Sequence, residues 1–232
     1  MNDDQTTRTE SLIQWPHRSA ARARQVEMVF GSSLIAYSAL AALAYRYSYF
    51  SWDLNFARFV QEITVPGFET LMIWNSVPGN GVIPWILVIA TGTILILARF
   101  RVEGIICMAG AGVGALIDRL MKALIDRPRP PDSLVRVMGD FNHESFPSGH
   151  VFFFVSFFGF LFFLTYALLK KGLLQRALLI LFGAMLVLIG LSRVYQGAHW
   201  PSDVVGAYLA GGAWLMLMIE VYRRLKLKQE TL

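Results

Sequence analysis

The sequence predicts an all-α integral membrane protein, with six transmembrane helices in one bundle and an amphipathic helix at the outer interface. Three observations predict this class: the composition, six long apolar runs, and the uneven distribution of Lys and Arg. The chain of 232 residues is 55% hydrophobic and 16% charged, whereas a soluble domain carries about 25% charged residues. The composition therefore argues against a soluble domain and excludes a disordered chain.

Each apolar run is long enough to cross a bilayer. About 20 residues suffice, because a helix rises about 1.5 Å per residue through about 30 Å of hydrocarbon. The third run is the weakest, since Glu103, Asp118 and Arg119 lie near its ends, but its glycines suit close helix packing. The runs cover roughly residues 26–45, 82–100, 103–121, 151–169, 173–191 and 203–221.

The basic residues predict the orientation. Of the 21 Lys and Arg, 13 lie on the side of the N-terminus if all six runs cross. By the positive-inside rule both termini are then cytoplasmic, and the protein lies in an inner or plasma membrane. The predicted parts are an N-terminal cytoplasmic segment (1–25), a membrane domain (26–221) and a basic cytoplasmic tail (222–232).

Two further features bear on partners and processing. Lys and Arg lie beside the apolar runs and form no single basic stripe, so we expect membrane lipids as partners and no nucleic acid. The first run ends in Ala42-Leu43-Ala44, which leaves a cleaved signal peptide as an alternative. The segment of about 25 residues before it is long and contains acidic residues, which argues against cleavage.

Residues 46–81 predict an amphipathic helix in the outer interface. Large apolar residues recur there at helical spacing, and polar residues take the other side. The helix either anchors the protein or helps admit a substrate. The apolar set is Trp52, Phe56, Phe59, Val60 and Ile63, and the polar set is Asp53, Asn55, Gln61 and Glu62.

Three short groups of polar residues are predicted to meet at one membrane face. His150 and Ser192 are separated by about 40 mostly apolar residues, which is one crossing and one return. The stretch from Lys122 to His150 is polar and Pro-rich and has no run that crosses. The groups are Lys122 with Arg129-Pro130, then Pro147 to His150, then Ser192-Arg193 with His199 and Asp203.

These residue types suit a phosphate group. Lys122, Arg129 and Arg193 supply three cations for a phosphate dianion and for the charge that develops as it transfers. Ser148 and Gly149 directly precede a predicted helix, where free backbone N–H groups and the helix dipole favour an anion. We therefore predict a phosphate-binding site made of these five residues.

The two histidines and the aspartate suit catalysis at phosphorus. His199 and Asp203 are four residues apart, so the carboxylate can orient the imidazole and stabilise its charged form. The free nitrogen of His199 then acts as the nucleophile. His150 is the predicted acid that protonates the leaving oxygen and later the base that activates water.

Several alternatives remain open. His143, His150, His199 and Asp203 could form a metal site, although three nearby cations would repel a divalent ion, so we expect no metal or other cofactor. Six spans also suit a transporter, although transporters place ionisable groups nearer the bilayer midplane.

The remaining polar residues near the three groups are given structural roles. Four charged residues are predicted to be ordinary loop charges, and Ser202 is predicted to cap the helix of the sixth run. The four are Asp126, Arg127, Asp132 and Arg136.

The three groups resemble the signature of the type 2 phosphatidic acid phosphatases. That signature has Lys, six residues and Arg-Pro; then Pro-Ser-Gly-His; then Ser-Arg, five residues, His, three residues and Asp. Residues 122–203 match every position. The resemblance implies a six-span enzyme with a core similar to that of vanadium haloperoxidases, which hydrolyses lipid phosphates without a metal.

The resemblance implies the same roles as the chemistry does. It implies a phosphate pocket of Lys122, Arg129, Ser148, Gly149 and Arg193, and a catalytic set of His199, Asp203 and His150. The short loops resemble the bacterial branch, which acts on undecaprenyl diphosphate, phosphatidylglycerol phosphate, phosphatidic acid or lipid A. A phosphotransferase that passes the phosphoryl group to a lipid acceptor remains an alternative, and the motifs decide neither the substrate nor the oligomeric state.

Overall fold

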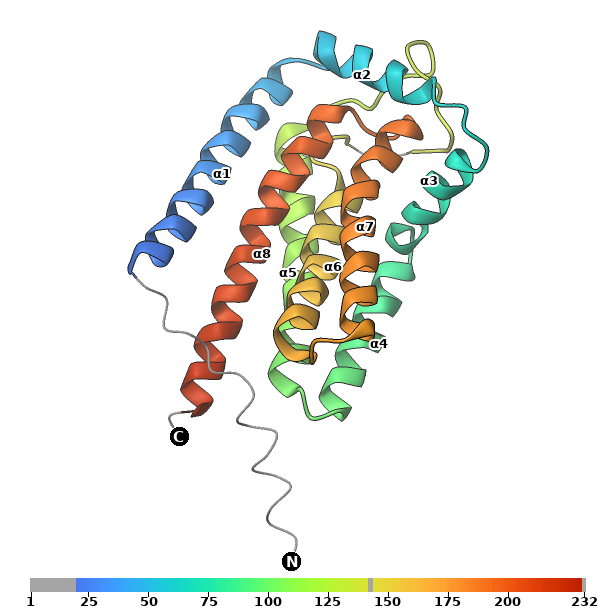
Figure 1. The fold of residues 1–232 in the computed structure, drawn as a ribbon. Helices are drawn as coiled ribbons and strands as arrows, with labels where there is room; N and C mark the ends of the chain where they lie inside the picture. The colour runs from blue at the N-terminus through green and yellow to red at the C-terminus, as the bar shows by residue number, and fades with distance from the viewer. Residues whose placement is uncertain (1–19, 142–143, 231–232) are drawn as a thin grey trace, which may run out of the picture.

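The structure is a computed structural model that describes residues 20–141 and 144–230. Within these ranges all regular secondary structure is helical (Figure 1). The elements are α1 (Ala20–Arg46), α2 (Ser51–Gln61), α3 (Phe68–Ser76), η2 (Val77–Gly79), α4 (Ile83–Leu97), α5 (Arg101–Ile125), α6 (Gly149–Leu168), α7 (Leu173–Tyr195) and α8 (Pro201–Glu230).

Each predicted apolar run forms one helix, but the helices do not all qualify as spans. Five of them are long and apolar enough to cross a membrane by themselves: α1, α5, α6, α7 and α8. The second run forms α4, which has only 15 residues. It passes the same test only together with the preceding helical segment, from which it is bent by 63°. The chain is therefore a multi-pass membrane protein with five such helices, or up to six if the bent pair is one span.

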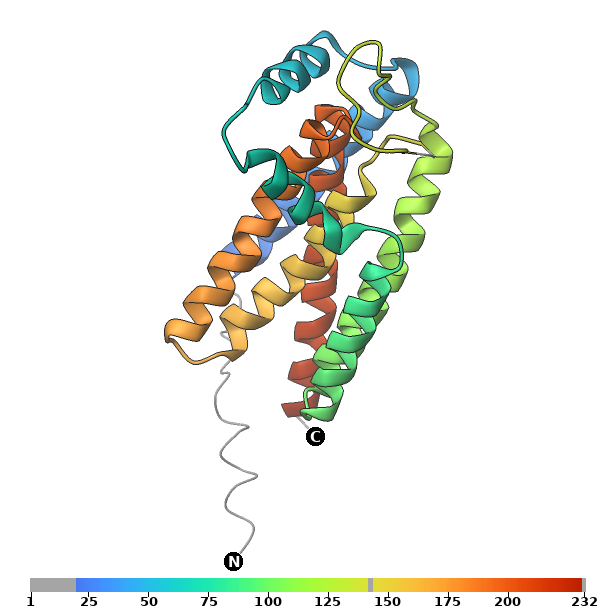
Figure 2. The same cartoon turned by 90° about the vertical axis from the view of Figure 1, so that its right-hand side faces the viewer.

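Helix α6 lies at the centre of the bundle and packs against α5, α7 and α8 (Figure 2). Its sequence is apolar on all sides, which is typical of a helix surrounded by protein. Phe152, Phe154, Phe157 and Phe160 are at most 2% exposed. The core of the molecule is therefore built around the helix that begins within the second predicted motif.

The small residues of α5 allow close packing at most of the predicted positions. A Cβ atom on Gly104 would lie 2.5 Å from the backbone oxygen of Gly92 in α4, and one on Gly110 would lie 2.2 Å from Met218 in α8. Gly114 lies against Trp214 and Phe152. The prediction was wrong for Gly112, which has nothing within 4 Å.

The predicted amphipathic helix forms as α2, but one of its polar residues faces the protein. Trp52, Phe56 and Phe59 are between 45% and 64% exposed, so the aromatic face points away from the bundle. Asp53, which the pattern places on the solvated side, is 0% exposed and lies on the face that also buries Val60. The reason is that Arg127, in the loop between α5 and α6, pairs with the carboxylate of Asp53.

The bundle has two distinct ends. Helix α2 and the described parts of the connection between α5 and α6, residues 126–141 and 144–148, cover one end, which we call the loop end (Figure 1). The start of α5 and the end of α8 lie at the opposite end, which we call the tail end. All three predicted motifs lie at the loop end.

Candidate active site

The three motifs come from three separated segments that meet at the loop end. Lys122 lies in the last turn of α5, and its Nζ donates to the carbonyl of Pro147 just before α6. The Ser148 N–H donates to the carbonyl of Asp203 at 3.2 Å, which joins α6 to α8. Arg129 Nη1 lies 3.3 Å from His199 Nε2. The predicted convergence is therefore present in the structure.

His199 lies in the turn between α7 and α8 and is 2% exposed. Its Nδ1 is 3.6 Å from Asp203 Oδ2 and 3.4 Å from the hydroxyl of Ser145. That hydroxyl donates to Asp203 Oδ2 at 2.5 Å, so it links the carboxylate to the imidazole. Ser145 was given no role from the sequence. Nε2 is turned toward Arg129, which leaves this nitrogen facing the predicted phosphate site.

Burial lowers the pKa of His199 well below its ordinary value. The cations Arg129, Lys122 and Arg193 act in the same direction, because a positive charge nearby disfavours the imidazolium form. His199 is therefore neutral at neutral pH. A neutral imidazole has the free electron pair that a nucleophile requires.

Asp203 is 0% exposed and accepts hydrogen bonds on both oxygens. Oδ1 is 2.5 Å from Arg127 Nη1, and Oδ2 accepts from Ser145 and from the Trp200 N–H, the latter at 2.8 Å. The carboxylate thus closes the first turn of α8 and lies 3.6 Å from Nδ1 of His199. A buried carboxylate needs such partners because an unpaired charge is costly in a protein interior.

Arg127 was predicted to be an ordinary loop charge, and this prediction was wrong. Its side chain is buried, and its Nη2 lies 3.1 Å from Asp53 Oδ2 of α2. Asp53 in turn accepts from the N–H and the hydroxyl of Ser202, at 2.8 and 2.7 Å. Ser202 is therefore not the helix cap that the sequence predicted, because its hydroxyl is bound to Asp53. Asp126, Asp132 and Arg136 are exposed, as expected of loop charges.

Arg193 is held in place by two neighbours. Its Nη1 donates to the hydroxyl of Ser76 in α3 at 2.5 Å, and its guanidinium lies 5.1 Å from the ring centre of Phe141. Arg129 lies against the same ring at 5.7 Å. Burial lowers the pKa of Arg129 from its ordinary value, and an arginine remains charged at neutral pH. Phe141 thus holds two cations of the predicted site side by side.

Two buried side-chain atoms of the predicted phosphate-binding residues have no hydrogen-bond partner among the described residues. One is the hydroxyl of Ser148, the residue that directly precedes α6, and the other is Nε of Arg193. Both are donors, and both are buried. One part of the prediction needs correction: the Ser148 N–H is not free for an anion, because the carbonyl of Asp203 accepts it. An anion at this site would be bound by the hydroxyl of Ser148 instead.

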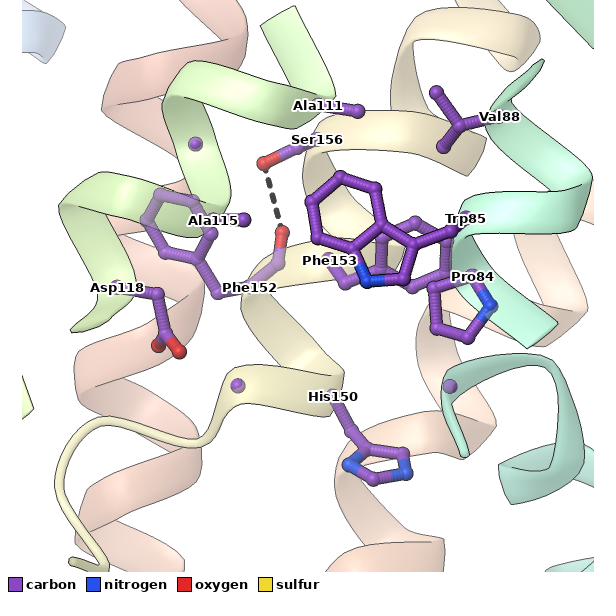
Figure 3. Close-up of a pocket in the computed structure, with 13 residues that line it drawn as sticks. Pro84, Trp85, Val88, Ala111, Ala115, Asp118, His150, Phe152, Phe153 and Ser156 are labelled. Atoms are coloured by element: carbon purple, nitrogen blue, oxygen red, sulfur yellow. Dashed lines mark hydrogen bonds between the residues drawn. The ribbon is translucent and has the colours of Figure 1, made fainter. Parts of the chain in front are cut away.

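His150 lies in the first turn of α6, at one end of a cavity of about 260 Å³ between α4, α5 and α6 (Figure 3). Its Nε2 lies 2.7 Å from Oδ1 of Asn80, a residue that sequence reasoning did not single out. Trp85, Val88 and Phe153 give the cavity a mostly apolar lining, and Asp118 lies beside it, 3.7 Å from Lys122 Nζ. The cavity therefore extends from His150, the general acid predicted from the sequence, into apolar surroundings.

The metal alternative is not supported by the positions of the described side chains. Within residues 20–141 and 144–230, no three His, Cys, Asp or Glu side chains are grouped so that they could hold a metal ion. His143, one of the four residues named for that site, lies outside the described residues.

Comparison with known proteins defines the class. The profile of the PAP2 superfamily matches residues 103–227, and the chain belongs to this superfamily. The matched region contains all three motifs. A crystal structure of a transmembrane PAP2-type phosphatidylglycerolphosphate phosphatase from Bacillus subtilis is similar, with a TM-score of 0.73, 24% identity, and coverage of 84% of this chain and 96% of that one. The likeness extends to the Aquifex aeolicus LpxE structure, with a TM-score of 0.52 and 20% identity over 74% of this chain and 96% of that one.

Two relatives are similar in sequence over about half of this chain. Phosphatidylglycerophosphatase B of Bacillus subtilis (strain 168) is 29% identical over 130 residues, which is 56% of this chain and 62% of that protein. A lipid A 1-phosphatase of Rhizobium johnstonii is 36% identical over 113 residues, which is 46% of this chain and 42% of that protein. The matches thus cover less than two thirds of the length of either relative.

Proposed function

We propose that the protein is a membrane phosphatase that removes phosphate from lipid phosphate monoesters or diphosphates. The observation that carries this proposal is the arrangement around His199. Asp203 and Ser145 lie on the Nδ1 side of the ring, and Arg129 lies 3.3 Å from Nε2. A neutral imidazole is thus oriented by an acid on one side and faces cations suited to a phosphate on the other.

The proposed reaction has two steps. His199 Nε2 attacks phosphorus, the bond from phosphorus to the lipid oxygen breaks, and His150 donates a proton to that oxygen. Water then attacks the phosphohistidine, the bond from phosphorus to Nε2 of His199 breaks, His150 takes up a proton from the water, and inorganic phosphate leaves. Asp203 stabilises the positive charge that the imidazole of His199 carries while it is phosphorylated.

The phosphate is proposed to lie among Lys122, Arg129, Arg193, Ser148 and Gly149. The unpartnered hydroxyl of Ser148 and the unpartnered Nε of Arg193 support this placement, because both are buried donors. As negative charge spreads over the phosphoryl oxygens in the transition state, fixed cations and donors stabilise it more than they stabilise the substrate. No metal or other cofactor has a role in this reaction.

The lipid part of the substrate is proposed to enter the apolar cavity next to His150. This cavity lies between α4, α5 and α6 and begins where the leaving oxygen would be. Its apolar lining suits an alkyl or prenyl chain. The proposed substrates are phosphatidylglycerol phosphate, phosphatidic acid and undecaprenyl diphosphate, with lipid A phosphate as the alternative. The two sequence relatives, a phosphatidylglycerophosphatase and a lipid A 1-phosphatase, support a lipid phosphate as the substrate.

The membrane placement completes the proposal. We propose six spans, with the bent pair of α3 and α4 as the second, and α2 in the outer interface with its aromatic face toward lipid. The N-terminal segment (1–25) and the tail (222–232) are then cytoplasmic, the domain of residues 26–221 lies in the inner membrane, and the site opens to the periplasmic face. The excess of Lys and Arg on the side of the termini supports this orientation.

Phosphate release from a panel of purified lipid phosphates in detergent micelles tests the proposal. We expect release that vanadate inhibits, because vanadate adopts the trigonal bipyramidal geometry of the transferring phosphoryl group, and that EDTA leaves unchanged. Activity lost with EDTA and restored by zinc would support a metal enzyme instead. Release that requires an added lipid acceptor would indicate a phosphotransferase.

A further inference from the structure

The turn between η2 and α4 lies directly against the proposed acid. Asn80 follows the short helix η2, and its Oδ1 is 2.7 Å from His150 Nε2. An amide oxygen only accepts hydrogen bonds, so Nε2 carries a hydrogen in this contact. The contact therefore assigns the two nitrogens of the ring: Nε2 binds Asn80, and Nδ1 remains for another partner.

Gly79 fixes the same ring from a second side. A Cβ atom at this position would lie 2.3 Å from Cδ2 of His150, so the imidazole packs directly on the main chain of the turn. Any larger residue at this position would displace the ring. The turn thus restrains both the rotation of the ring, through Asn80, and its position, through Gly79.

The segment before this turn is itself attached to the site. Ser76 accepts the hydrogen bond from Arg193, and the carbonyl of Met72 accepts from the hydroxyl of Ser192 at 2.5 Å. Helix α3 and the turn therefore form one support that contacts the end of α7 and the start of α6. A residue in this support can hold the acid at a fixed place relative to Arg193.

We propose that Asn80 is the positioning residue of the general acid, and that His150 delivers its proton from Nδ1. This inference rests on the proposed function, which makes His150 the acid. In the first step His150 is doubly protonated, a form that the bound phosphate dianion stabilises. Its Nδ1–H proton goes to the lipid oxygen as the bond from that oxygen to phosphorus breaks, and Nε2 keeps its hydrogen, which is bonded to Asn80. In the second step Nδ1 takes a proton from the attacking water. Asn80 itself never contacts the substrate.

The dependence of the reaction on the leaving group separates this role from a structural one. An alkoxide leaving from phosphatidic acid needs a proton, whereas p-nitrophenolate is stable without one. For Asn80→Ala we expect kcat/KM to fall about 10- to 100-fold with phosphatidic acid, because a positioned acid contributes about 10²- to 10⁴-fold. With p-nitrophenyl phosphate we expect a change of less than about 3-fold, since no proton is required.

Three variants make the experiment specific. Asn80→Asp keeps an acceptor oxygen for Nε2–H and is expected to retain most of the turnover of phosphatidic acid. Gly79→Ala displaces the ring and is expected to reproduce the leaving-group dependence of Asn80→Ala. Asn55→Ala, at an exposed position of α2, is the matched control and is expected to leave both substrates unchanged.

A double-mutant cycle identifies the residue through which Asn80 acts. In a His150→Ala background, Asn80→Ala should cause no further loss with phosphatidic acid, because the interaction it supports is already gone. Equal losses with both substrates, or additive losses in the cycle, would overturn the inference while leaving the proposed function intact. Full turnover of phosphatidic acid by folded His150→Ala would instead refute the proposed acid. Thermal unfolding of each variant in detergent shows which of them are folded.

Discussion

Helix α8 has a buried cluster of charged residues near each of its ends. At the loop end, Asp203 and Asp53 share the guanidinium of Arg127, and the side chains of all three are 0% exposed. At the tail end, Glu103 of α5 accepts from the hydroxyl of Tyr222 at 2.9 Å and pairs with Lys226 at 2.8 Å, where Lys226 is 25% exposed. Both clusters tie α8 to the rest of the bundle.

The two clusters differ in their charge balance and in what lies next to them. Two carboxylates meet one cation at the loop end, so the group is electrostatically suited to stabilise one more positive charge, and His199 is its neighbour. The tail end has one carboxylate and one ammonium, and it adjoins no other described ionisable group with a role in the proposed site. A buried ion pair alone therefore does not indicate function. The loop-end cluster differs because its uncompensated negative charge lies next to the proposed nucleophile.

Arg127→Met is expected to have the largest effect. It leaves Asp53 and Asp203 buried without their cation, and breaking a buried pair costs about 3–5 kcal/mol of unfolding free energy. Turnover should fall at least about 10³-fold, since Asp203 can no longer hold His199 in its orientation. Thermal unfolding and phosphate release measure the two losses.

Arg136→Met is the matched control for this variant. Arg136 lies in the same loop, but its pair with Glu69 is half exposed, so its loss should change stability by less than about 1 kcal/mol. If Arg136→Met lowered the free energy of unfolding and the turnover as much as Arg127→Met, the loop-end cluster would contribute no more than an exposed ion pair.

Arg129→Gln is expected to lower kcat/KM about 10²-fold and to change its pH dependence. In the proposed reaction the neutral form of His199 attacks phosphorus, and burial together with Arg129 holds the pKa of this residue well below its ordinary value. On the acidic side of the pH profile, activity of the wild type should therefore decline only below about pH 6.5, the ordinary pKa of histidine. Without the cation the pKa of His199 rises, so the acidic decline should move to higher pH. A decline at the same pH in both proteins would mean that burial alone determines the pKa.

Glu103→Ala is expected to affect stability without affecting the chemistry. Tyr222 loses a partner inside the protein, which costs about 1–3 kcal/mol, while Lys226 can reach water. The folded variant should release phosphate within about 2-fold of the wild-type rate, because no part of the tail-end cluster contacts the site. A loss of turnover as large as that of Arg127→Met would show that the two ends are coupled.

Phe141→Leu is expected to have the smallest effect. The ring lies against both Arg129 and Arg193, and such contacts contribute about 0.5–1 kcal/mol each at partly exposed sites. KM for a lipid phosphate should rise about 2- to 10-fold with kcat nearly unchanged, since the ring positions the two cations in both the ground and the transition state. A loss confined to kcat would mean that the ring acts only on the transition state.

Much of this architecture follows from sequence pattern, because hydropathy and motif spacing are local properties. The six runs form helices, and the distance between His150 and Ser192 correctly places both motifs at one end. The bend before α4 was not predicted, since its 15 residues are as apolar as those of a full span.

The supporting residues could not be predicted for a different reason. Asp53 and Arg127 resemble solvated charges in the sequence, and only the packing of α2 against α8 shows that each is the partner of the other. Ser145 and Asn80 reach the two histidines across 54 and 70 residues of sequence. Motif spacing identifies the side chains that are predicted to bind phosphate or to catalyse its transfer. The hydrogen-bond partners of these side chains depend on contacts between segments that are distant in the sequence.

The phosphorylated intermediate provides the most direct test of the proposed mechanism. Purified protein is mixed with phosphatidic acid that carries a ³²P-labelled phosphate, quenched in alkali within milliseconds, and digested for mass spectrometry. We predict an acid-labile, alkali-stable phosphoryl group on His199 that is absent from His199→Ala. Rapid phosphate release with no label on the protein, or a label on any residue other than His199, would contradict the assignment of this histidine as the nucleophile.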